Sequence, residues 1–264
     1  MLSYEFMRKA FIVGGLLALI IPLIGANMVF KRLSLLGDAL SHVSLSGVTI
    51  GLIIGINPVL SAILTTIVAA IVIEIMRVKL KRYQELSLAI ILSFGVGLAG
   101  FLLKYVSSGA NFESFLFGSI VTISNFELWL IVALSSIILL VVFWFYRAFF
   151  FVAFDELAAD LSGINVKLVN YAFTILIAIT VALASRTVGV LVVSSLMVLP
   201  VATAGQLAKS YRHNLIMAMF FGLLSVWSGI ILAYYFDFKP GGTIVLLGVG
   251  LLIITLAFTS IKKK

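Results

Sequence analysis

Asp38 and His42 are the pair in this sequence whose types and spacing best suit chemistry. They are four residues apart, so on an α-helix their side chains lie on one face about a turn apart. A carboxylate and an imidazole placed this way can bind one divalent metal ion together. Asp38 could instead cap a helix that starts after Gly37. A cap does not account for His42, because an ionisable side chain one turn deeper in an apolar helix is costly and therefore a functional candidate.

The helix that carries this pair has a polar face and a smooth face. At 100° per residue, Thr49 returns to within about 20° of Asp38, which makes Thr49 a candidate for lining a pathway. Gly47, Gly51 and Gly55 cluster on the opposite side, where small residues allow a neighbouring helix to approach closely. We therefore expect the Asp38 and His42 face to line a cavity.

A second polar set lies in the stretch SRTVGVLVVSSLMVLPVATA. Pro200 lies inside this apolar run and favours a kink, which membrane helices tolerate when neighbours satisfy the freed carbonyl. The hydroxyl side chains of this run either line a pathway or pack between helices, and packing is the more common role. The pathway candidates here are Ser194, Ser195 and Thr203.

Residues 154–166 form a short amphipathic pattern with acidic residues first and a glycine stop, which suits a helix lying on a membrane surface. Such a helix either docks a partner or is an ordinary interfacial helix. The candidate docking residues are Phe154, Asp155, Glu156, Leu157, Asp160, Leu161 and Gly163.

Composition determines which elements must position these residues. Of 264 residues, 63% are hydrophobic and only 11% are charged, whereas a soluble domain carries roughly 25% charged residues. The chain reads as an all-α, polytopic helical membrane protein with about eight to nine transmembrane helices in one domain, residues 1–264. Spans are expected near residues 11–29, 40–56, 59–75, 86–103, 128–145, 168–184, 188–207, 215–235 and 243–261. Residues 107–126 are too polar to cross. With no cysteine, thiolate chemistry and Cys-ligated zinc are excluded.

The net charge of +8 is a signal of membrane topology and does not indicate nucleic acid as a partner. Nine alternating spans place most Lys and Arg residues on one side, which is therefore the cytoplasm, and place the N-terminus outside. Arg8 and Lys9 compete with Lys31 and Arg32 to orient the first helix, so an eight-span arrangement with a buried or re-entrant first segment stays open.

The common catalytic and nucleotide-binding motifs are missing. Gly95, Gly97 and Gly100 satisfy GxGxxG, but they lie inside an expected span, so they indicate helix packing. The sequence contains no Walker loop, no HExxH and no GxSxG pattern. We therefore expect a chain that is not an enzyme and that leaves any ATP hydrolysis to a partner.

Five stretches in this order resemble the membrane permease subunit of ATP-binding-cassette importers for zinc, manganese and iron. They are GDALSH, LFGSIVTISNFELW, FDELAADLSGINVKLVNY, SRTVGVLVVSSLMVLPVATA and PGGTIVLL, and together they cover nearly the whole chain. The resemblance implies a type II ABC importer permease fold in the plasma membrane of a prokaryotic cell. It also implies that Asp38 and His42 coordinate a transported Zn2+, Mn2+ or Fe2+ ion, with no permanently bound cofactor.

The resemblance further implies three protein partners. Such permeases work as homodimers, dock a cytoplasmic ATP-binding subunit through a coupling helix, here residues 154–166, and receive the metal from an extracytoplasmic solute-binding protein. ATP-driven movement of the coupling helices would then give alternating access. The alternative is an ion-coupled secondary transporter without an ATPase, in which Asp38 and His42 relay protons. No strong inverted repeat supports that alternative.

Overall fold

The structure, a computed structural model, describes residues 1, 3–80, 83–106, 118 and 123–262, and all regular elements in this part are helices. Nine of them are long and apolar enough to cross a membrane. These are α1 (Glu5–Phe30), α2 (Leu35–Ile54), α3 (Pro58–Lys79), α4 (Gln84–Leu102, continued by the 3-10 turn η2, Leu103–Tyr105), α6 (Asn125–Trp144), α9 (Val166–Thr187), α10 (Val190–Leu207), α11 (Tyr211–Phe236) and α12 (Pro240–Lys262). The all-α prediction is confirmed, and the nine-span version agrees with this count. Residues 107–117 and 119–122 of the predicted polar segment lie outside the described residues.

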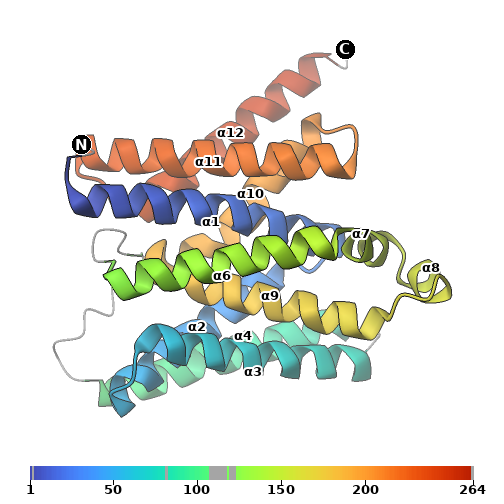
Figure 1. The fold of residues 1–264 in the computed structure, drawn as a ribbon, viewed down its shortest axis with the longest axis horizontal. Helices are drawn as coiled ribbons and strands as arrows, with labels where there is room; N and C mark the ends of the chain where they lie inside the picture. The colour runs from blue at the N-terminus through green and yellow to red at the C-terminus, as the bar shows by residue number, and fades with distance from the viewer. Residues whose placement is uncertain (2, 81–82, 107–117, 119–122, 263–264) are drawn as a thin grey trace.

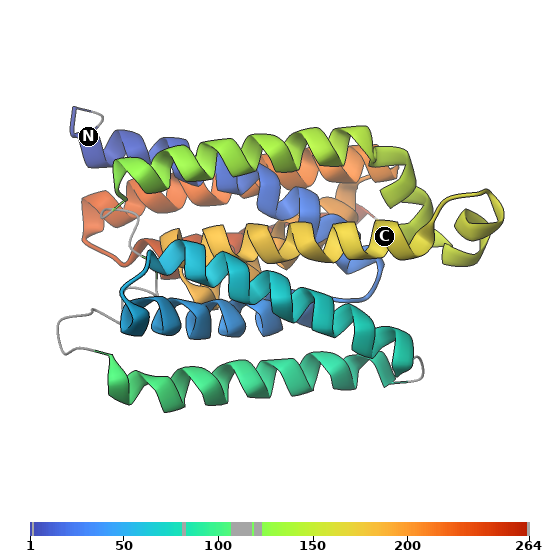
Figure 2. The ribbon, with the colours of Figure 1, turned by 60° about the horizontal axis from the view of Figure 1, so that its bottom comes forward.

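Helix α1 is the most buried of the nine spans and contacts α6, α9, α10 and α11 (Figure 1). Its side chains Leu17, Ile20, Ile21 and Ile24 are fully buried. Close packing depends on glycine where α1 crosses α10, because a Cβ on Gly25 would lie 2.2 Å from the carbonyl oxygen of Met197. Helices α4, α6 and α12 bury the least of their surface, and Figure 2 shows α4 along one edge of the bundle.

Local signals in the sequence determine where several helices begin and end. The Asn57 side chain accepts hydrogen bonds from the backbone N–H groups of Val59 and Leu60, and Pro58 occupies the first helical position of α3. Ser124 and Glu127 form a reciprocal capping box on α6. Gly55 ends α2 with φ +78°, a left-handed conformation that glycine adopts at little cost.

Two short helices, α7 (Tyr146–Phe154) and α8 (Glu156–Leu161), connect α6 to α9. They lie at one end of the bundle, with α8 projecting from it, and the N-terminus lies at the other end (Figures 1 and 2). With nine alternating spans, the basic connectors after α1, α3, α6 and α10 share the end that carries α8. The positive-inside rule makes this the cytoplasmic end.

Candidate metal-binding site and docking helix

Asp38 and His42 lie in the first half of α2 and face the same side. The Nε2 atom of His42 is 3.9 Å from Oδ1 of Asp38, and 21% of the His42 side chain and 38% of the Asp38 side chain are exposed. In the fully described stretch 36–51, every residue except Asp38, His42 and Ile50 is buried. A carboxylate and an imidazole, both of which can bind a metal ion, therefore occupy most of the open strip of this otherwise buried stretch of α2.

Three neighbouring helices fix the rotation of α2 and so determine where this open strip faces. On the α3 side, a Cβ on Gly47 would lie 2.7 Å from the Cα of Ala62, and one on Gly51 would lie 2.9 Å from the Cα of Pro58. The expected close approach along this glycine face is therefore present at Gly47 and Gly51. Gly55 has no atom within 4 Å and serves only to end the helix.

On another side, α4 contacts α2 at the level of His42. A Cβ on Gly95 would lie 2.8 Å from the backbone nitrogen of Val43 and 3.0 Å from the carbonyl carbon of His42. The Ser46 hydroxyl donates a hydrogen bond of 2.6 Å to the Gly95 carbonyl oxygen. From α9, Ser185 hydrogen-bonds Ser44 at 2.7 Å. Any displacement of α4 would thus be felt at the backbone of His42.

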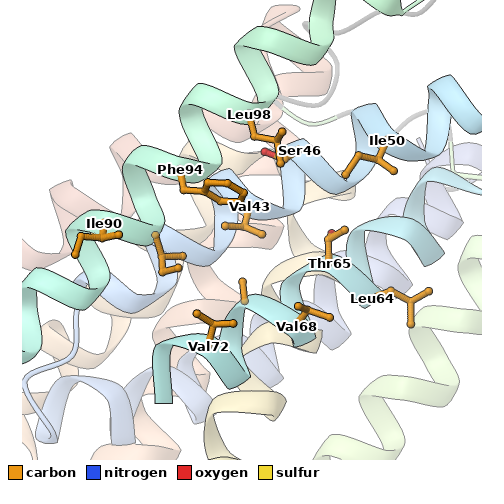
Figure 3. Close-up of a pocket in the computed structure, with 12 residues that line it drawn as sticks. Val43, Ser46, Ile50, Leu64, Thr65, Val68, Val72, Ile90, Phe94 and Leu98 are labelled. Atoms are coloured by element: carbon orange, nitrogen blue, oxygen red, sulfur yellow. The ribbon is translucent and has the colours of Figure 1, made fainter. Parts of the chain in front are cut away.

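A groove of about 570 Å3 runs beside α2, between α3 and α4. Figure 3 shows Val43 and Ser46 of α2 facing Phe94 and Leu98 of α4, with Val68 of α3 across the groove. The lining is almost entirely hydrocarbon and does not include Asp38 or His42. Because hydrocarbon offers no ligand to a cation, this groove is not the route of a metal ion.

The other predicted pathway residues differ in exposure. Thr49 is buried, and its hydroxyl donates to the carbonyl oxygens of Leu45 and Ser46 at 3.2 and 2.7 Å. Thr203 is also buried and donates to the carbonyl oxygen of Leu199 at 2.8 Å. In this conformation both threonines have a packing role, whereas Ser194 and Ser195 on α10 are half-buried and remain candidates for a pathway lining.

Within the predicted docking segment 154–166, Glu156–Leu161 form the short helix α8, and Val166 already begins α9. Phe154 ends α7, Asp155 caps α8 by accepting hydrogen bonds of 3.0 Å from the N–H groups of Leu157 and Ala158, and Gly163 follows the helix with φ +81°. Asp160 is exposed on α8. Three large apolar residues are also exposed here: Phe154 at 58%, Leu157 at 73% and Leu161 at 82%. An apolar surface on a projecting helix at the cytoplasmic end is typical of a protein interface.

Sequence reasoning missed the residues that attach α8 to the bundle. The Nζ atom of Lys31, just after α1, lies 2.8 Å from Oε1 of Glu156. Burial lowers the pKa of Lys31, and the hydrogen bond and charge of Glu156 oppose this only in part. Burial raises the pKa of Glu156, but the hydrogen bond and charge of Lys31 outweigh it, so this pKa is lowered. In the sequence, Lys31 is recognisable only as a topology signal. Its side chain, 8% exposed, is a buried structural contact.

Comparisons with known proteins identify the family of the chain. Residues 3–259 match the ABC 3 transport family. The chain is 38% identical to a probable metal transport system membrane protein of Treponema pallidum, over all of this chain and 99% of that one. It is 28% identical to a manganese transport system membrane protein of Listeria monocytogenes, over 98% of this chain and 92% of that one.

A solved structure of a related complex has the same fold. PsaBC from Streptococcus pneumoniae, determined in complex with a Fab, matches with a TM-score of 0.85 at 25% identity, covering 96% of this chain and 91% of that one. The family match extends over nearly every residue that forms the bundle, the α2 site and α8. The chain therefore belongs to the ABC 3 transport family and is a non-catalytic, multi-pass membrane permease of a bacterial ABC transport system.

Proposed function

We propose that this permease imports a divalent transition metal, Mn2+, Fe2+ or Zn2+, and that Asp38 and His42 bind the ion during its passage. The observation that carries the proposal is the open strip of α2, where these two side chains are accessible in the stretch 36–51, of which every other residue except Ile50 is buried. Ionisable side chains inside a membrane are retained where they face a water-filled route. The relative from Listeria is named for manganese transport. A carboxylate with an imidazole suits all three metals.

A homodimer would complete the coordination of the ion. Among the residues that the structure describes, no group of three or more His, Asp or Glu side chains could hold a metal ion. These metals take about four to six ligands. Two copies related by a two-fold axis would supply two carboxylates and two imidazoles. We therefore place the translocation path between two copies of the chain, where each open strip of α2 can face the other.

The energy for transport would come from a cytoplasmic ATP-binding subunit that docks on α8. The exposed Leu157 and Leu161 offer the apolar contact, and an open groove of about 790 Å3 beside them is lined by Glu156, Asp160 and Lys167 among others. An extracytoplasmic solute-binding protein would deliver the metal at the opposite end. Closure of the ATPase pair would move α8 and switch the access of the α2 site from outside to inside. Membership in an ABC transport family argues against the alternative of an ion-coupled carrier.

Reconstitution tests this function directly. The purified permease alone should hydrolyse no ATP and transport no metal, whereas the complex with its ATPase and solute-binding protein should take up metal in an ATP-dependent way. Metal uptake into liposomes that contain the permease alone, driven by a pH gradient, would contradict the proposal.

Replacing both Leu157 and Leu161 by alanine is expected to weaken ATPase binding by about a hundredfold. Burying a leucine side chain contributes about 1.5 to 3 kcal/mol, so the loss of two gives at least this change in affinity. The measurement is a titration of purified ATPase onto permease in lipid nanodiscs. Ser162→Ala is the matched control, because Ser162 is exposed directly after α8 and its hydroxyl bonds only within the segment. Equal affinity of the double variant and the wild type would show that the ATPase docks elsewhere.

A further inference from the structure

A set of polar side chains, buried except at Glu156 and Gln84, connects α8 to the transmembrane helices at the cytoplasmic end. Its first part is the Lys31 junction, which we define as Lys31, Glu156 and Asn170. The Lys31 ammonium contacts Glu156 Oε1 at 2.8 Å and donates a hydrogen bond to Asn170 Oδ1. The Asn170 amide donates to the same Glu156 oxygen at 3.2 Å. Each side chain therefore contacts both others, and the junction joins the end of α1, the start of α8 and the first part of α9.

The second part continues from the junction to α3 and α4. The Thr174 hydroxyl, one turn along α9, contacts the Asn170 carbonyl oxygen at 2.9 Å and Glu74 Oε2 at 3.1 Å. Glu74 pairs with Arg77 at 2.9 Å, and both side chains are buried. Arg77 Nη2 then lies 3.4 Å from Oε1 of Gln84, the first residue of α4.

These contacts form a continuous polar route across four spans. Burying its polar and charged groups costs free energy, and packing of the helices does not require them. Buried charges are expensive unless they are paired, and an apolar core of the same shape would be at least as stable. Retaining Glu74, Arg77 and Lys31 in this region is therefore better explained by a positional role than by stability. The far end of the route is α4, and α4 contacts the backbone of His42 and Val43 through Gly95.

We propose that the Lys31 junction, with Thr174, Glu74 and Arg77, is the mechanical link by which movement of α8 repositions α3 and α4 and thereby changes the access of the Asp38 and His42 site. This inference rests on the proposed docking of an ATPase at α8. The linking residues touch neither ATP nor metal, so they are positioning residues. Replacing them should lower metal transport relative to ATP hydrolysis, while the ATPase and the solute-binding protein stay bound.

The deciding measurement is the number of metal ions transported per ATP hydrolysed by the complete complex in liposomes. Coupling between distant sites is commonly worth a factor of five or more, so Lys31→Met and Glu156→Gln should each lower this ratio at least about fivefold. ATPase co-purification should stay near that of the wild type in both variants. The melting temperature should stay near wild type in Lys31→Met and fall in Glu156→Gln, because the buried Lys31 ammonium then loses its charged partner. The charge swap Lys31→Glu with Glu156→Lys should restore much of the ratio. Lys209→Met, which removes an exposed positive charge from another connector at the cytoplasmic end, should leave it unchanged.

Thr174→Val gives an independent test, because it removes the hydroxyl between Asn170 and Glu74 and leaves the pair of Lys31 and Glu156 intact. It should also lower the ratio at least about fivefold. The link would be overturned if the ratio is unchanged in the Lys31 and Glu156 variants. If those variants fail to assemble, an unchanged ratio in Thr174→Val would overturn it. A parallel loss of uptake and hydrolysis at constant ratio would show a purely structural role. If no ATPase assembles with the wild-type permease, the proposed function itself fails, which is a distinct result.

Discussion

Replacing Asp38 or His42 by alanine is expected to abolish metal uptake while the transporter complex stays assembled. Each substitution removes one of the two proposed metal ligands that each chain offers on the open strip of α2. Mutating a group that only orients a metal ligand lowers metal affinity or activity by about 10- to 100-fold. Loss of a ligand itself should therefore lower uptake by at least about a hundredfold. The measurement is uptake of radioactive metal by cells or liposomes, together with co-purification of the ATPase subunit.

Ile50→Ala is the matched control for these variants, because Ile50 is the third residue of the 36–51 stretch that is not buried and it carries no ligand. It should transport at close to the wild-type rate. Normal uptake in both Asp38→Ala and His42→Ala would remove the assigned metal site. A drop that is equal in all three variants would indicate damage to the α2 surface and not loss of ligands.

The spans and the shared helix face of Asp38 and His42 could be predicted from the sequence because both depend on local patterns. Apolar runs long enough to cross a membrane predict the nine spans that are found in the described part of the chain. A spacing of four residues placed Asp38 and His42 on one face, and a helical wheel correctly separated that face from Gly47 and Gly51.

Features that depend on neighbouring helices could not be predicted in this way. The helical wheel places Thr49 beside Asp38, yet Thr49 is buried. A wheel gives the direction in which a side chain points and not how deeply it is buried. The contact of Lys31 with Asn170 joins residues 139 positions apart, and nothing local marks such a pair. One part of this link does have a local signal: Glu74 is followed three residues later by Arg77 inside an apolar span, and this spacing favours a side-chain pair.

Replacing Gly95 by alanine is expected to lower uptake by about an order of magnitude and to destabilise the permease. The added methyl would lie 2.8 Å from the backbone nitrogen of Val43, so α4 or α2 must shift. Overpacking of this kind costs about 1 to 3 kcal/mol. Because backbone is the obstacle, no side-chain rotation can relieve the clash, and the shift falls on the turn that presents His42.

Gly97→Ala provides the comparison on the same helix, since a Cβ at Gly97 meets nothing within 4 Å. It introduces the same methyl and the same change in helix propensity, so any difference between the two variants reports the contact with α2. Melting temperature in detergent and metal uptake should fall in Gly95→Ala and stay near wild type in Gly97→Ala. If the two variants behave alike, α4 does not position His42. The route that we propose from α8 through α3 and α4 would then have no contact by which to reach the metal site.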